Sequence, residues 1–451
     1  MKTASAGGMF RLVACLAATL ACDGYAADDV TALGTVLTAV GAETAGSADG
    51  AIPPYTGALL PPAGYRTGDG RRIDPFADEK PVRVITPASA PGAGAQLTDG
   101  TRELLRRHPG FRIDVYPSHR TVGYPDYILE NTRRNATTMS TAADRGISKA
   151  LPGVPFPIPR DGNEVMWNHR MRCMGRAIAF QYESWLMTSG GLPVLTSSAH
   201  SVWDFPVFDA KRAAPLQPDE ILFQWKVDYT GPQRRAGESL LLFDAVDPLR
   251  QARRVWSYLP GQRRARQVEM PDDAPHGSSS GAYVNDDAFV YTGVLERFDV
   301  KLLGKREMII PYNTYRFSYH PKVDDLLQPG HLNPDYLRWE LHRVWVVEAT
   351  LKPGEHHVYG RRVFYVDEDS WTALAADEYE TDGRLRRTVF AFLSQSYDAV
   401  VPFSINHAVY DFGQGSYFLA FFPGAHSGVK YVQPLPSSQW TPDAMAGAGV
   451  R

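Results

Sequence analysis

The sequence predicts a mainly β protein of the α+β class, built on a large antiparallel sheet. The 451 residues include 34 prolines, 39 glycines and 22 tyrosines, a composition typical of many strands joined by turns. Residues 341–393 divide into four β-rich runs separated by short Pro-Gly, acidic and Asp-Gly turns, which predicts a four-stranded meander. The regular helix–strand alternation of a parallel sheet is missing from the sequence.

The first 26 residues have the pattern of a secretory signal peptide. Lys2 and Arg11 supply positive charge, residues 12–22 are apolar, and small residues precede Ala27. The apolar run is too short to span a bilayer. We therefore expect an exported protein. Attachment of a lipid at Cys15 or Cys22 is the alternative, although neither cysteine follows a complete lipoprotein pattern.

The rest of the chain predicts one domain with two less regular ends. Residues 27–95 are rich in Ala, Gly, Pro and Thr, and we expect an extended segment that lies on the body of the protein. Residues 96–440 are expected to form the domain, and 441–451 a flexible tail. The domain begins with helical patterns at 97–110, at 124–142 and from about Gly162.

Eight strand patterns follow, and those at 221–230, 341–351 and 356–366 contain runs that are apolar on both faces. The eight patterns lie at 176–187, 221–230, 238–246, 298–312, 341–351, 356–366, 371–380 and 384–393. A sheet with one face in water alternates polar and apolar residues more regularly. Two explanations stay open: helices cover the second face, or that face lines an apolar cavity suited to a lipid-like ligand.

Residues 255–268, "VWSYLPGQRRARQV", predict a β-hairpin with arginines on its second strand. Pro260 and Gly261 suit the centre of a type II turn, with a positive φ at Gly261. A tight hairpin would place Tyr258 opposite Arg263, Trp256 opposite Ala265, Ser257 opposite Arg264 and Val255 opposite Arg266. Because type II turns splay tight hairpins, a longer loop is the alternative. In either case we expect the arginines to be split between two faces.

No catalytic motif, metal cluster or cofactor loop occurs in the sequence. G-x-S-x-G, GxGxxG, Walker and HExxH patterns are absent, so we expect neither an enzyme nor a bound cofactor. The net charge of −3 disfavours nucleic acid as a partner. Of the three cysteines only Cys173 follows the signal peptide, and a buried structural role is favoured over a reactive thiol.

Some histidines and carboxylates leave alternatives open. His119, His169 and His342 each neighbour an arginine, which suits an anion site, although structural hydrogen bonding is favoured. His356 and His357 are adjacent and would point to opposite faces of a strand. The acidic runs at 367–370 and 377–383 could suggest a calcium loop or a glycosidase pair, but they fall at predicted turns where such residues are common.

The sequence resembles the DUF1329 family of exported Gram-negative proteins over nearly the whole mature chain. Seven collinear segments carry the resemblance: 33–57, 74–81, 153–159, 255–267, 302–313, 329–354 and 365–371. That family is similar to the LolA and LolB lipoprotein carriers. The resemblance implies an incomplete β-barrel, or half-barrel, with helices on its concave face and an apolar cavity for acyl chains.

The resemblance also implies a function, a location and partners. We expect a periplasmic carrier or chaperone for a lipid or other hydrophobic molecule, with transient membrane contact. The implied partners are an RND-type (MmpL-like) exporter and a DUF1302-family protein. The alternatives are an exported enzyme that acts on a lipid or polysaccharide, and an adaptor without a small ligand.

Eight residues are the sequence-based candidates for ligand binding. Six aromatic residues would line the pocket and two arginines would lie at its rim, where they would select the head group. The candidates are Trp225, Trp256, Tyr258, Trp345, Phe364 and Tyr365 for the lining, and Arg264 and Arg266 for the rim.

Overall fold

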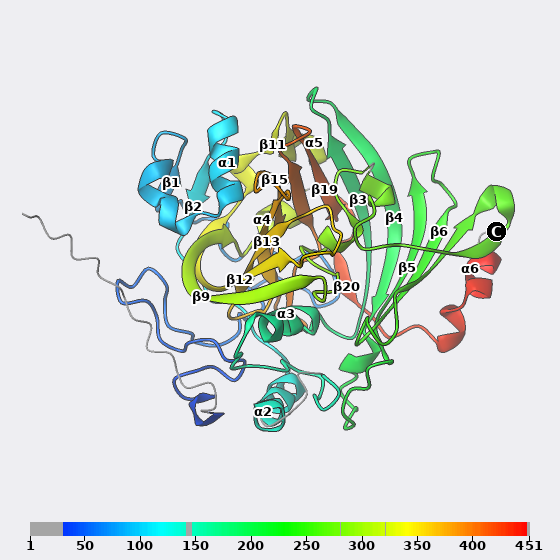
Figure 1. The fold of residues 1–451 in the computed structure, drawn as a ribbon, viewed down its shortest axis with the longest axis horizontal. Helices are drawn as coiled ribbons and strands as arrows, with labels where there is room; N and C mark the ends of the chain where they lie inside the picture. The colour runs from blue at the N-terminus through cyan, green and yellow to red at the C-terminus, as the bar shows by residue number, and fades with distance from the viewer. Residues whose placement is uncertain (1–29, 141–146, 280, 321, 449–451) are drawn as a thin grey trace, which may run out of the picture.

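One open sheet organises the molecule. The computed structural model describes residues 30–140, 147–279, 281–320 and 322–448, and within them sixteen strands form a curved sheet (Figure 1). Every pairing between neighbouring strands is antiparallel except a short parallel contact between β12 and β2. The predicted fold class is therefore confirmed. The signal-peptide prediction for residues 1–26, with Cys15 and Cys22, lies outside the described residues.

The two edges of the sheet come from the first 268 residues, and strands from the C-terminal part of the chain lie between them. The main path runs β1-β2-β12-β13-β14-β15-β18-β19-β3-β4-β5-β6-β7-β8, with β9 paired to β12 and β20 to β3. The strands of this sheet are β1 (Arg83–Ile85), β2 (Ile113–Val115), β3 (Ala177–Met187), β4 (Pro193–Asp204), β5 (Ile221–Gly231), β6 (Ser239–Ala245), β7 (Arg254–Leu259), β8 (Arg264–Val268), β9 (Phe298–Pro311), β12 (Trp339–Leu351), β13 (Arg361–Asp367), β14 (Ala373–Tyr379), β15 (Leu385–Ala391), β18 (His407–Asp411), β19 (Ser416–Phe422) and β20 (Val429–Tyr431). Two separate small pairs are β10 (Leu327–Gln328) with β11 (His331–Leu332) and β16 (Ser394–Ser396) with β17 (Val401–Phe403).

The helices lie close to where their sequence patterns predict them. The first three are α1 (Asp99–Arg107), α2 (Asp126–Ser140) and α3 (Gly162–Arg170). Thr98 caps α1 by accepting a hydrogen bond from the backbone N–H of Thr101. The remaining α-helices are α4 (Tyr315–Ser318), α5 (Val323–Leu326) and α6 (Pro442–Ala448). Among the described residues, no helix has both the length and the apolar character needed to cross a membrane.

Both faces of the central strands are covered, which explains why β12 to β15 lack a polar face. On one face α1 packs against β14 and β15, and the backbone N–H groups of Asp99 and Gly100 donate to the Asp377 carboxylate at 2.9 Å. The other face, called the inner face below, carries Phe364. It is covered by α3 and by the irregular segment 281–291, whose Tyr291 contacts Phe364 at 5.0 Å between ring centroids. Of the two explanations left open by the sequence, covering is the one seen here.

A buried ion cluster lies on the inner face. Arg362 is fully buried on β13 and forms ion pairs with Asp286 at 2.5 Å, Asp287 at 2.9 Å and Glu378 at 2.7 Å. Two of these carboxylates come from the 281–291 segment and the third from β14. The cluster therefore fastens the irregular segment to the sheet by charge as well as by apolar contact.

The outer strands β5 to β8 are covered less completely. The C-terminal helix α6 lies beside this end of the sheet, far from α1 in the view of Figure 1. Met445 of α6 and the preceding Trp440 are buried against Leu241, Phe243 and Tyr258. Residues 441–451 are therefore not simply a tail as predicted: their first part is helical, because it supplies the apolar cover that this face of the sheet needs.

The hairpin formed by β7 and β8 has the longer loop rather than the tight register. Tyr258 lies opposite Ala265 and Ser257 opposite Arg266, two residues out of step with the tight prediction. The turn is a 3₁₀ segment at Pro260–Gln262, and the left-handed residue is Arg263, with φ 52°, rather than Gly261. Arg264 and Arg266 share one face because they are two residues apart.

One predicted strand starts later than expected. β13 begins at Arg361, so His356 and His357 precede it and do not alternate across a strand. His356 is exposed, whereas the His357 ring is buried with its Nε2 3.3 Å from the Asp286 carboxylate. Pro353-Gly354 starts a loop that brings His357 to the ion cluster, and this contact outweighs the strand propensity of the surrounding residues.

Candidate functional site

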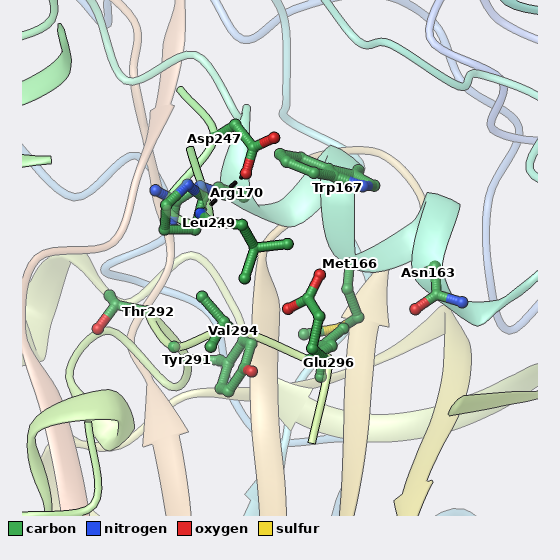
Figure 2. A pocket seen from close by; sticks show the side chains of 13 residues that line it. Asn163, Met166, Trp167, Arg170, Asp247, Leu249, Tyr291, Thr292, Val294 and Glu296 are labelled. Carbon is green, nitrogen blue, oxygen red and sulfur yellow. Dashed lines mark hydrogen bonds between the residues drawn. The ribbon is translucent and has the colours of Figure 1, made fainter. Parts of the chain in front are cut away.

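The strongest candidate for a ligand site is a pocket beside α3, called the α3 pocket below. It lies between α3 and the segments 247–249 and 291–296, and its volume is about 80 Å³. In Figure 2, Leu249 projects between Trp167 on the helix and Val294 on the opposite segment. The lining residues are Asn163, Met166, Trp167, Arg170, Asp247, Pro248, Leu249, Tyr291, Thr292, Gly293, Val294, Leu295 and Glu296.

Helix α3 presents one face to this pocket. Asp161 caps the helix by accepting from the backbone N–H groups of Asn163 at 3.0 Å and Glu164 at 3.1 Å. The four lining residues Asn163, Met166, Trp167 and Arg170 follow the i, i+3, i+4, i+7 spacing of a single helix face. Sequence reasoning missed these residues, although their spacing was a usable signal once the helix was recognised.

His169 fixes the wall of the pocket to the sheet. Its Nδ1 accepts from the backbone N–H of Ala373 at 2.9 Å, so its Nε2 donates to the carbonyl of Tyr291 at 3.2 Å. Burial, together with the nearby charge of Arg172, holds the pKa of His169 far below its ordinary value. The ring is therefore neutral and serves as a positioning residue that joins α3, β14 and the segment that carries Tyr291.

Arg170 places a cation at the inner end of the α3 pocket. Its guanidinium donates to the carbonyls of Ala245 at 2.8 Å and Val246 at 3.2 Å. No carboxylate of the described residues lies within ion-pair distance of it, and burial lowers its pKa below the ordinary value. Arg170 thus donates only to neutral carbonyls, although the Asp244 carboxylate is near enough to act on its charge, and its guanidinium is suited to an anionic group.

A larger cavity continues from the α3 pocket. It measures about 370 Å³, within the usual range for small-molecule sites, and shares Arg170, Leu249 and Val294 with the pocket. Arg253 also lines it and is paired with Asp244 at 2.7 Å. The combined site has apolar side chains at Met166, Leu249 and Val294, with the Glu296 carboxylate beside Met166 (Figure 2), and a more highly charged end beyond Arg170. This arrangement fits an amphiphile.

The predicted binding residues of the outer strands are divided between two faces. Trp225 is buried on the inner face, where its indole N–H donates to Ser201 Oγ at 2.7 Å and its ring meets Trp203 edge-on. Trp256 and Tyr258 belong to the opposite face and pack in the cluster that includes α6. The structure therefore does not bring these three aromatic residues together.

The predicted aromatic residues of the central strands are also separated. Phe364 lies one side chain away from the α3 pocket, through its contact with Tyr291. Tyr365 points to the other face, and its hydroxyl donates to Asp377 at 3.2 Å. Trp345 is half-buried beneath Lys305, whose Nζ is 4.8 Å from the indole centroid. None of these three residues is among the described lining residues of the α3 pocket or the adjoining cavity.

Arg264 and Arg266 are exposed on β8 and line neither hollow of the described site. The next residues of the same strand, Gln267 and Val268, do line the larger cavity. Strand β8 therefore lies next to the site. The arginines that line the larger cavity are Arg170 of α3, Arg253 before β7 and Arg297 before β9.

The remaining residues singled out by sequence have protein partners. His119 Nε2 lies 2.7 Å from Glu79, and His342 Nε2 lies 3.0 Å from Glu340. Cys173 is buried, and burial raises the pKa of its thiol to about 12, which confirms the structural role over the reactive one. The acidic residues 367–369 are buried rather than solvated at a turn.

Comparison with known proteins places the chain in a family. "Uncharacterized protein PA3922" of Pseudomonas aeruginosa is 36% identical over 446 residues, which cover 97% of this chain and 96% of that protein. A DUF1329 family protein from Desulfovibrio piger gives a TM-score of 0.43 at 15% identity, with 63% of this chain and 97% of that chain covered. The LolA superfamily protein NE2245 from Nitrosomonas europaea gives 0.37 at 13% identity, with 63% and 100% covered.

The family model described as "Protein of unknown function (DUF1329)" matches residues 84–446, most of the chain. Together with the Pseudomonas relative, this match shows that the chain belongs to the DUF1329 family.

Proposed function

We propose that the protein is an exported, periplasmic carrier that binds a hydrophobic molecule in the α3 pocket and the adjoining cavity. The observation that carries the proposal is the pairing of an apolar wall, formed by Met166, Leu249 and Val294, with Arg170, whose hydrogen-bond acceptors among the described residues are carbonyls. The sequence resemblance to lipoprotein carriers led to the same class of ligand. The apolar part of the ligand would lie beside Met166, Leu249 and Val294.

The two ends of the ligand would contribute to binding in different ways. Each methylene moved from water into an apolar environment contributes about 0.8 kcal/mol, so affinity would come mainly from chain length. An anionic group beside Arg170 would gain a charge-assisted hydrogen bond and would fix the orientation of the ligand. We therefore propose an anionic amphiphile, such as a fatty acid or an acidic lipid, as the ligand class.

Localisation and partners belong to the same proposal. The pattern of residues 1–26 supports export, and a carrier in the periplasm needs a donor and an acceptor for its ligand. We propose an RND-type exporter and a DUF1302-family protein in these roles, as the sequence resemblance implies. Co-purification of either with the tagged protein would support this part independently of ligand binding.

The first test asks whether the protein carries a ligand. Protein purified without detergent would be extracted with organic solvent and the extract analysed by mass spectrometry. The proposal expects one class of lipid-like molecule at a reproducible ratio to protein. Absence of any such molecule, together with no binding of a fluorescent fatty acid, would reject the carrier and leave an adaptor without a small ligand.

A matched pair of variants then tests the location of the site. Leu249 is 56% exposed and lines the pocket, whereas Leu192 is 68% exposed in the turn between β3 and β4. Leu249→Asp places a charge in the apolar pocket and is expected to weaken fatty-acid binding by about tenfold or more. Leu192→Asp should leave binding unchanged. Equal affinities for the two variants would place the ligand elsewhere.

A further inference from the structure

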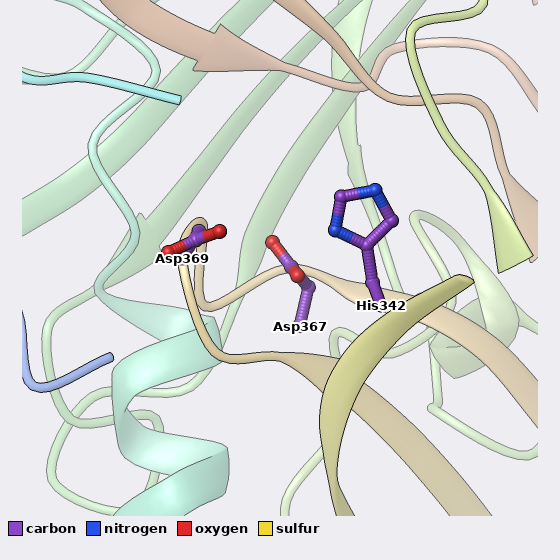
Figure 3. A group of neighbouring side chains, drawn as sticks. All are labelled: His342, Asp367 and Asp369. Atoms are coloured by element: carbon purple, nitrogen blue, oxygen red, sulfur yellow. The ribbon is translucent and has the colours of Figure 1, made fainter. Parts of the chain in front are cut away.

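A second cluster of potential ligand atoms lies at the end of β13, away from the α3 pocket. His342 of β12, Asp367 at the end of β13 and Asp369 in the following turn each offer one atom, and these atoms lie within 4.8 Å of one another. All three residues are buried, with exposures of 1%, 0% and 3%. In Figure 3, Asp367 lies between the other two side chains. The antiparallel pairing of β12 with β13, which sets Val344 opposite Asp367, brings them together.

The His342 ring is held as a metal-binding histidine usually is. Its Nε2 lies 3.0 Å from Glu340. Glu340 also accepts a hydrogen bond from Arg338 Nε at 2.6 Å, so this carboxylate acts as an acceptor and takes the Nε2–H of His342. The lone pair is then on Nδ1, and in Figure 3 a ring nitrogen faces Asp367. Stacking on Tyr312, at 3.6 Å between centroids, fixes the ring.

Asp367 supplies an unsatisfied oxygen at the centre of the cluster. Its Oδ2 accepts from the backbone N–H of Ser370 at 2.8 Å and from the Tyr312 hydroxyl at 3.3 Å. Its Oδ1 is buried and has no hydrogen-bond partner among the described residues. A buried acceptor without a partner costs free energy, so such atoms are rare in folded proteins unless an ion or water binds them.

Unlike Asp367, the neighbouring carboxylates of Asp369 and Glu368 are in contact with cations. Asp369 accepts two hydrogen bonds from Arg120, at 2.7 and 2.9 Å, and Glu368 pairs with Lys305 at 2.7 Å. No ion pair to Asp367 occurs within the described part of the chain. The cluster therefore combines one free carboxylate oxygen, one imidazole lone pair and a second carboxylate whose oxygens retain lone pairs beyond those used by Arg120.

We propose that His342, Asp367 and Asp369 bind one divalent transition-metal ion. One imidazole nitrogen and two carboxylate oxygens form a donor set that suits zinc and its neighbours better than calcium, which takes six or more oxygens. A cavity of about 70 Å³, lined by Asp369 together with Tyr55 and Tyr124, lies next to the cluster. The metal site goes beyond the proposed carrier function and does not depend on it.

The local sequence contains no metal motif because the ligands come from two strands and a turn. Four of the segments that carry the family resemblance nevertheless meet here: 33–57 through Glu43, 302–313 through Tyr312, 329–354 through His342 and 365–371 through Asp367. The position of the site under the N-terminal segment suggests a structural ion rather than a catalytic one.

The test uses the full-length mature chain without a histidine tag. After dialysis against a chelator, the protein would be titrated with zinc chloride in a calorimeter and its thermal unfolding measured with and without zinc. We expect one zinc per chain, and a rise in Tm of about 3 °C at about a hundredfold excess over Kd. A wild-type chain that binds no zinc and keeps its Tm would overturn the proposal.

Three variants locate the site. Asp367→Asn and His342→Gln are close in size to the native residues and should each lower zinc affinity about 100-fold or more, while Glu340→Gln should lower it about 10- to 100-fold by releasing the ring. His407→Gln, a buried histidine outside the cluster, should bind zinc like the wild type. Circular dichroism would check that each variant is folded. Zinc binding that persists in Asp367→Asn and His342→Gln would also reject the site.

Discussion

Strands β13 and β7 have similar sequences and different environments. β13 reads RRVFYVD and β7 reads RVWSYL, so both place aromatic side chains after arginine. In β13 all residues but the first are buried, and Arg362 lies among three carboxylates. In β7 only Val255 and Tyr258 are buried, and the neighbouring β8 is largely exposed.

The environments of β13 and β7 differ because different segments cover the two strands. The 281–291 segment brings Asp286 and Asp287 to β13, whereas α6 covers the β7 side of the sheet with the apolar Met445. We therefore expect the central strands to tolerate substitution less well than the outer strands. The outer strands, with α3 and the loops before β7 and β9, leave room for the α3 pocket. We expect substitutions in the first region to change stability and substitutions around the second to change ligand binding.

The largest expected effect is the loss of a buried cation. Arg362→Leu leaves Asp286, Asp287 and Glu378 without their shared partner, and we expect unfolding free energy to fall by about 3–5 kcal/mol, measured by urea denaturation. Arg264→Leu on the exposed β8 should change it by about 0.5 kcal/mol or less. Similar losses of unfolding free energy in the two variants would contradict the proposed difference between the central and the outer strands.

The second effect is a pH dependence specific to the central strands. Burial is the main reason that the pKa of Asp377 rises from 3.8 to about 6, although hydrogen bonds from Thr388 and Gly100 oppose the shift. Because the folded pKa lies above the unfolded one, the stabilising contribution is complete below pH 3.8 and is lost as pH rises through 6. Asp377→Asn removes this titration.

Unfolding free energies of the wild type and Asp377→Asn would be compared at pH 4 and pH 7. Relative to the variant, the wild type should lose about 2.4 kcal/mol of stability over this interval. Asp382→Asn, in an exposed turn, controls for the removal of one carboxylate from the same pair of strands. Parallel curves for the wild type and Asp377→Asn would contradict the assignment.

The third prediction concerns α6, whose packing against the outer strands should affect stability but not ligand binding. Met445→Ala shortens a fully buried side chain of α6 and should lower unfolding free energy by about 2 kcal/mol. Its cluster shares no residue with the α3 pocket or the adjoining cavity as described, so fatty-acid affinity should not change. A variant that lost binding along with stability would mean that α6 supports the ligand site.

The smallest effect concerns the head group. Arg170→Met should lower affinity for an alkyl carboxylate by about tenfold relative to the alcohol of equal chain length, because a single charge-assisted hydrogen bond is lost. Arg266→Met tests the cation first suggested by the sequence and should leave both affinities unchanged. The reverse result would move the rim of the site to β8.

Those helices and strands whose signal lies in neighbouring residues can be predicted from the sequence. The helices at α1, α2 and α3, the strands from β12 to β15 and the β7–β8 hairpin all follow periodicity, caps and turns. Strand β4 was missed because "LTSSAH" within it is polar and lacks a strong β pattern. The hairpin register depended on Arg263 adopting a left-handed conformation, which sequence rules assign first to glycine.

The candidate sites depend on contacts between remote segments and could not be predicted in the same way. Trp225 and Trp256 looked equivalent along the sequence, yet strand alternation and different covering segments put them on opposite faces. The acidic run at 367–370 looked like a solvated turn, because Arg120 and Tyr55, which cover it, are more than 240 positions away. Only the helical spacing from Asn163 to Arg170 was a local signal for the pocket.

The most direct test of the carrier proposal is a chain-length series. Binding of n-alkyl carboxylates of increasing length would be measured by displacement of a fluorescent fatty acid from the wild type and from Leu249→Asp. We predict that wild-type affinity rises about fourfold per methylene until the cavity is filled, and that the rise is strongly reduced in Leu249→Asp. Affinity that is independent of chain length, or identical in the two proteins, would contradict hydrophobic binding in the α3 pocket.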